Sequence, residues 1–114
     1  MDIENQIEQV EITIEQAKEK VTQKSSLDKL LSNKDFIDII LVGYFKNEAS
    51  AMALMLGNPA TQTEVDQTRI IKNIEGIGRL NNYFSSIMQL GHIAEKTIKE
   101  HEELRSELLK EEVA

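Results

Sequence analysis

The chain contains no cysteine and no tryptophan, and only one proline, three phenylalanines and two tyrosines in 114 residues. The absence of cysteine excludes a disulfide scaffold, a thiolate zinc site and a cysteine nucleophile, and it fits a reducing compartment. Basic residues are also few, 13 against 20 acidic ones, for a formal net charge of −7. Since binding to a phosphate backbone needs clustered lysine and arginine, we expect no direct nucleic-acid binding.

The composition is that of a folded chain. Hydrophobic residues make up 40% and charged residues 29% of the sequence, which separates it from disordered proteins. The length allows either one compact domain or an extended helical protein.

From the residues present, we expect neither a membrane span nor a secretion signal. Residues 1–4 are acidic and lack the basic region and apolar stretch of a signal peptide, so we predict a protein that is not secreted. The stretch from Phe36 to Leu56 is apolar enough to suggest a membrane span, but it contains Asp38, Lys46 and Glu48. An Asp or Lys at mid-bilayer costs about 2.5–3.5 kcal/mol. We therefore predict a helix that is buried in protein and contacted on several sides.

Residues 1–24 carry a heptad pattern. Apolar residues recur at alternating spacings of four and three, with glutamate and lysine between them. The seam consists of Ile3, Ile7, Val10, Ile14, Ala17 and Val21. About three heptads are marginal for a free-standing coiled coil, so this arm is expected to pack on another helix, from this chain or from a copy of it.

Polar and turn-forming residues divide the rest of the chain. Ser25-Ser26 is predicted to end the first helix or to cap a short one at Leu27–Leu31, and Ser32 or Asn33 to cap a helix that begins near Lys34.

The strongest stop is Gly57-Asn58-Pro59, where Gly57 can take the left-handed conformation and Pro59 cannot donate a helical hydrogen bond. Thr61, with Glu64 at the capping-box spacing, or Thr63 is expected to cap the next helix.

The last helix is predicted from about residue 61 to about residue 111, a length of roughly 75 Å. Its three glycines each cost about 1 kcal/mol relative to alanine in a helix interior. They therefore predict a kink near Gly76-Ile77-Gly78 or, alternatively, close helix approach at Gly91 and Ala94.

Together these signals predict an all-α fold. We expect an antiparallel helical hairpin with a long C-terminal helix, and an additional N-terminal amphipathic, coiled-coil-like helix. The predicted parts are a heptad-patterned arm at residues 1–24 and the hairpin with its charged tail at residues 25–114.

No pattern in the sequence indicates catalysis. His92 and His101 lack a glutamate three residues earlier, so the Glu-X-X-His metal motif is absent. Gly76-Ile77-Gly78 lacks the third glycine and the preceding strand of a dinucleotide loop. No serine shows the nucleophile-elbow pattern. We predict a protein that is not an enzyme, with no catalytic residue, metal or cofactor.

The apolar segments instead predict a helix–helix interface. Gly43-Tyr44-Phe45, followed by Lys46-Asn47-Glu48, would give an aromatic centre with a polar rim, and a chain of this size has little else to cover a helix that is apolar on all sides. A homo-oligomer is therefore expected. The predicted interface residues are Ile3, Ile7, Val10, Ile14, Phe36, Ile40, Tyr44, Phe45, Met52, Met55, Phe84, Ile87 and Met88.

Two stretches carry a family resemblance, one from Leu31 to Phe45 and one from Gly76-Ile77-Gly78-Arg79-Leu80 to Gly91-His92-Ile93-Ala94-Glu95. Over about residues 27–110 the chain resembles small proteins encoded in the structural gene clusters of tailed bacteriophages. The resemblance implies a virion structural or assembly protein (a minor head, neck or decoration component) whose partners are other virion proteins, located in the virion or the host cytoplasm. The acidity favours an alternative, a small phage-encoded regulator that binds a basic surface of a host protein.

Overall fold

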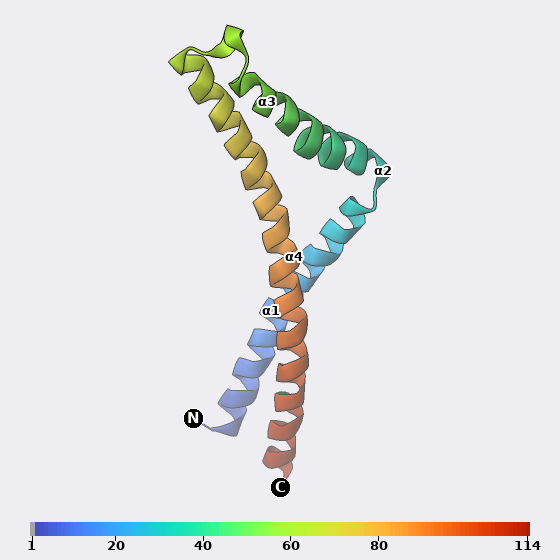
Figure 1. The fold of residues 1–114 in the computed structure, drawn as a ribbon. Helices are drawn as coiled ribbons and strands as arrows, with labels where there is room; N and C mark the ends of the chain where they lie inside the picture. The colour runs from blue at the N-terminus through green and yellow to red at the C-terminus, as the bar shows by residue number, and fades with distance from the viewer. Residues whose placement is uncertain (1) are drawn as a thin grey trace. The chain divides into compact units, whose positions relative to one another are not determined.

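The computed structural model describes residues 2–114, and every regular element among them is helical, so the predicted all-α class is confirmed (Figure 1). The elements, in order, are α1 (Ile3–Leu31), α2 (Lys34–Phe36), the π-helix η1 (Ile37–Glu48), α3 (Ala49–Leu56), the 3-10 turn η2 (Pro59–Thr61) and the long helix α4 (Glu64–Val113).

Helix α1 is longer than expected, because it continues through Ser25-Ser26 to Leu31. The prediction of a separate short helix at Leu27–Leu31 is therefore wrong. Serine lowers helix stability by only a few tenths of a kcal/mol, so two serines do not end a helix whose flanking residues favour it. Asn33 is the cap of the next element, since its Oδ1 accepts a 3.0 Å hydrogen bond from the Phe36 amide.

From Lys34 to Leu56 the chain is helical without a break, and its middle twelve residues form the π-helix η1. A π-helix of this length is rare, since most are single-turn bulges. Gly43 lies within it, and an added Cβ there would be 3.0 Å from the carbonyl oxygen of Asp38, five residues earlier. A residue without a side chain therefore suits this backbone.

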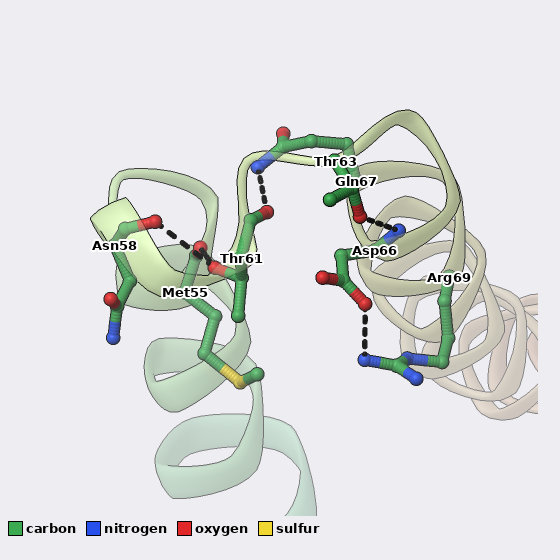
Figure 2. Close-up of polar contacts among 7 residues, drawn as sticks. All are labelled: Met55, Asn58, Thr61, Thr63, Asp66, Gln67 and Arg69. Atoms are coloured by element: carbon green, nitrogen blue, oxygen red, sulfur yellow. Dashed lines mark hydrogen bonds and ion pairs between the residues drawn. The ribbon is translucent and has the colours of Figure 1, made fainter.

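Side chains close the turn between α3 and α4 (Figure 2). The Thr61 hydroxyl donates a 2.6 Å hydrogen bond to the Met55 carbonyl, and Gln67 Nε2 donates to the carbonyls of Leu56 at 3.1 Å and Thr61 at 2.9 Å. The free carbonyls at the end of α3 are thus satisfied without a left-handed residue. Gly57 has φ −98° and ψ 0°, so the predicted left-handed conformation is wrong.

Thr63 caps α4. Its Oγ1 accepts a 3.1 Å hydrogen bond from the Asp66 amide, whereas the Thr61 side chain serves α3 (Figure 2). Of the two predicted caps, Thr63 is therefore the one in place, and α4 begins at Glu64.

Removing this cap tests its contribution. Thr63→Ala is expected to lower the free energy of unfolding by about 1 kcal/mol, because one amide of the first turn loses its acceptor. Thermal unfolding followed by circular dichroism measures the loss. The control is Thr68→Ala, at an exposed position inside the same helix. It should leave the free energy of unfolding unchanged or raise it slightly. Equal losses in both variants would contradict the assignment.

The chain divides into two compact units, one made of residues up to Leu27 with Ser86–Ala114, the other of Asp28–Ser85. The predicted division into residues 1–24 and 25–114 differs from this one, and as a statement about domains it stays a prediction.

In the first unit, α1 packs antiparallel to the C-terminal part of α4. The core consists of Ile7, Val10 and Ile14 from α1 and Leu108 from α4. At the other end of the pair, Lys24 Nζ lies 3.0 Å from Glu95 Oε1. The heptad seam of the N-terminal arm therefore meets a helix of the same chain, one of the two possibilities that the sequence left open.

Gly91 brings the two helices of this unit together. It is buried, and an added Cβ would overlap the Cβ of Lys24 and lie 2.8 Å from its Cδ. By contrast, no atom lies within 4 Å of a Cβ added at Gly76 or Gly78, where α4 continues unbroken. Gly91 is thus the position of close approach that the sequence offered as the alternative to a kink.

Alanine substitution should therefore have opposite effects at two glycines of α4. Gly91→Ala is expected to destabilise by about 1–3 kcal/mol, because the helices must move apart to admit the methyl group. Gly78→Ala is expected to stabilise by about 1 kcal/mol, because alanine favours helix and meets no neighbour. Urea unfolding of both variants measures the two signs, and a gain at Gly91 would show that the close approach is absent.

Candidate interaction site

The segment Lys34–Leu56 is the most apolar part of the second unit, yet none of its residues is buried. The prediction of a central helix contacted on several sides is therefore wrong. Within residues 28–85 the only long helical segment beside it is the first part of α4, and a single neighbour covers one side of a helix.

Burial separates an inner from an outer face on this segment. The half-buried inner residues are Phe36, Ile37, Ile40, Leu41, Gly43, Tyr44, Phe45, Ala49, Met52, Met55 and Leu56. On the outer face Ile39 is 67%, Val42 41% and Leu54 78% exposed. The outer face thus holds large apolar side chains in solvent.

All five aromatic residues of the chain are connected by ring contacts between this segment and α4. The Phe84 ring from α4 lies 5.8 Å from the ring of Phe36 and 5.8 Å from that of Phe45, measured between centroids. Tyr44 and Tyr83 extend the cluster, 5.9 Å from Phe45 and 6.3 Å from Phe84. Aromatic pairs favour such tilted and edge-on arrangements. The cluster therefore holds the apolar segment against α4.

A shallow hollow of about 240 Å³ lies between this segment and α4. It is lined by Tyr44, Glu48, Met52, Asn73 and Ile77. The carboxylate of Glu48 is exposed, and the lining offers no pairing of a nucleophile with a base.

The two histidines belong to the first unit. His92 is exposed, with Nδ1 3.8 Å from Glu95 Oε2, and His101 Nδ1 lies 3.0 Å from the Thr97 carbonyl oxygen. Across residues 2–114 no group of three or more His, Cys, Asp or Glu side chains is placed to hold a metal ion.

The predicted interface residues all lie on faces that are at least partly covered by the chain itself. Ile7, Val10 and Ile14 are buried. The half-buried ones are Ile3, Phe36, Ile40, Tyr44, Phe45, Met52, Met55, Phe84, Ile87 and Met88. Their part in an interface with another chain stays a prediction.

The sequence prediction missed the outer residues Ile39, Val42 and Leu54. Because apolar residues surround the whole helix, periodicity alone gave no signal for which side α4 would cover. Their exposure in the structure is what identifies the outer face.

Among residues 2–114, Lys34–Leu56 is the one helical segment long and apolar enough to cross a membrane, with 23 residues where about 20 are needed. It also carries Asp35, Asp38, Lys46 and Glu48, all of them exposed. The core helix of a soluble protein and a signal sequence can have the same length and composition.

No family model, curated protein or solved structure matches this chain.

Proposed function

We propose that this chain is a non-enzymatic virion structural or assembly protein of the phage type, which acts through helix–helix interfaces and self-associates. The observation that carries the proposal is the exposed outer face of Lys34–Leu56. Large apolar side chains that are exposed on one side of a helix can mark a site where another molecule binds. The same proposal includes two finer features of the fold. One is a helical hairpin, and the other is a coiled-coil pairing of helices in the first unit.

The outer face supports self-association more than catalysis or ligand capture. Its large side chains stand on a helix whose other side is fixed by the aromatic cluster around Phe84, so a partner meets a surface that is already ordered. Pre-ordered apolar surfaces bind at a lower entropic cost than flexible ones.

Sedimentation analysis tests this proposal. We expect an oligomer at micromolar concentration that persists at high salt, because apolar burial holds it together. Ile39→Lys should weaken the oligomer, whereas Val113→Lys, at an exposed position near the C-terminus, should not. A wild-type monomer at micromolar concentration would contradict self-association.

A second function, an acidic regulator that binds a basic surface of a host protein, is favoured by one observation. Exposed glutamates line the side of α1 away from its buried seam, at Glu8, Glu11, Glu15 and Glu19, around the exposed Ile12. Mass spectrometry separates the two functions: the structural role expects the protein in purified virions, and the regulator expects it only in lysates of infected cells.

A further inference from the structure

Exposed residues spaced about four apart lie along one side of Lys34–Leu56; Asn47, Glu48, Ala51, Ala53 and Leu54 are exposed as well. Asp38 and Ile39, then Val42, then Lys46, and then Ser50 are exposed, while the residues between them include the half-buried inner ones. This outer stripe has an apolar centre at Val42 and one charge on each side of it.

The two charges are opposite in sign and equidistant from Val42. Asp38 lies four residues before it and Lys46 four residues after it. The ion pair of Asp38 is with Lys34, at 3.4 Å, and both side chains are more than half exposed, so it contributes little. Within residues 2–114, Lys46 forms no ion pair. Both charges are therefore available to a partner.

We propose that a second copy of this chain docks antiparallel on the outer stripe, with Val42 at the two-fold axis and Asp38 opposite Lys46 of the partner subunit. In a two-fold interface the same surface meets itself, so a residue four before the axis meets a residue four after it. Among the exposed residues of the stripe, no like charges are then opposed. The inference rests on the self-association proposed above and names its surface.

A parallel arrangement lacks this complementarity. In register it would place each Asp38 against its own copy and each Lys46 against its own copy, and opposed like charges in an interface are unfavourable. Charge complementarity therefore selects the antiparallel pair.

Charge reversal at these two positions tests the arrangement. Asp38→Lys and Lys46→Asp should each weaken self-association by about tenfold or more, because like charges then meet twice across the axis. The double variant D38K/K46D should return to within about threefold of the wild-type dissociation constant, because both pairs are restored with reversed polarity. Glu100→Lys and Lys96→Glu, an exposed pair on α4 with the same charge changes, are the controls and should have no such effect.

Cross-linking gives an independent measurement, since the chain has no native cysteine. Helices in contact have axes about 8–10 Å apart, and a Cα lies about 2.3 Å from its own axis, so facing Cα atoms at the two-fold come within disulfide range. Val42→Cys should therefore oxidise rapidly to a covalent dimer. Ile12→Cys, whose native side chain is 42% exposed against 41% for Val42, should not.

The outcomes separate this inference from the proposed function. A wild-type monomer overturns both. A wild-type oligomer in which single charge reversals change nothing, or in which the two cysteine variants cross-link equally, overturns the antiparallel docking and leaves self-association standing. If the wild type floats with phosphatidylcholine vesicles and loses its oligomer, a bilayer and not a second copy binds the stripe. That result would overturn the inference.

Discussion

Replacing Ile14 by alanine is expected to lower the free energy of unfolding by about 2–5 kcal/mol. Ile14 is 2% exposed and belongs to the core that joins α1 to α4 through Ile7, Val10 and Leu108. Truncation removes buried methyl groups and leaves a cavity, and two helices provide few other side chains to fill it. The loss is a large part of the roughly 5–15 kcal/mol that holds a typical domain folded.

Urea unfolding followed by far-ultraviolet circular dichroism measures this loss. The matched control is Ile12→Ala, the same substitution two residues earlier in the same helix. Ile12 is 42% exposed, so its truncation should change stability by no more than about 0.5 kcal/mol. Equal losses of stability at Ile12 and Ile14 would contradict the assignment of Ile14 to the side of α1 that faces α4.

The second large effect is expected at Ile70 in the other unit. Ile70 is 1% exposed and is one of the two most completely buried side chains among the described residues, the other being Ile14. Ile70→Ala should cost about 2–5 kcal/mol by the same loss of buried surface and cavity formation.

Its neighbour Ile71 provides the control. Ile71 is 46% exposed on the same helix, so Ile71→Ala should be nearly neutral. Hydrogen exchange of residues 28–85 is the second measurement for Ile70→Ala, because amide protection there should fall along with the global stability. Unchanged protection and unchanged stability in this variant would show that Ile70 is not a core residue.

Local signals predicted the elements that local forces control. The stop at Gly57-Asn58-Pro59 is where α3 ends, because proline cannot donate a helical hydrogen bond wherever it is placed. Ser25-Ser26 did not end α1, since serine only weakly disfavours helix and no turn-forming residue accompanies it. The helix end at Gly57-Asn58-Pro59 was therefore predictable from backbone chemistry, whereas two serines were too weak a signal to place one.

The candidate site was only partly predictable. Its location on residues 34–56 follows from composition, and the inner aromatic residues Phe36, Tyr44 and Phe45 were among those predicted. The outer residues Ile39, Val42 and Leu54 were not, because the sequence surrounds this helix with apolar side chains and gives each side equal weight.

The sequence by itself determined that this protein is all-helical, that it lacks cysteine chemistry, and that its N-terminal seam must pack on another helix. These properties depend on residue types and on spacing along one chain. Only the tertiary structure decided that α4 of the same chain covers that seam, that Gly91 is the point of close approach, and that one side of Lys34–Leu56 stays exposed. Those outcomes depend on which segments, distant in sequence, come into contact, and helical periodicity carries no information about that.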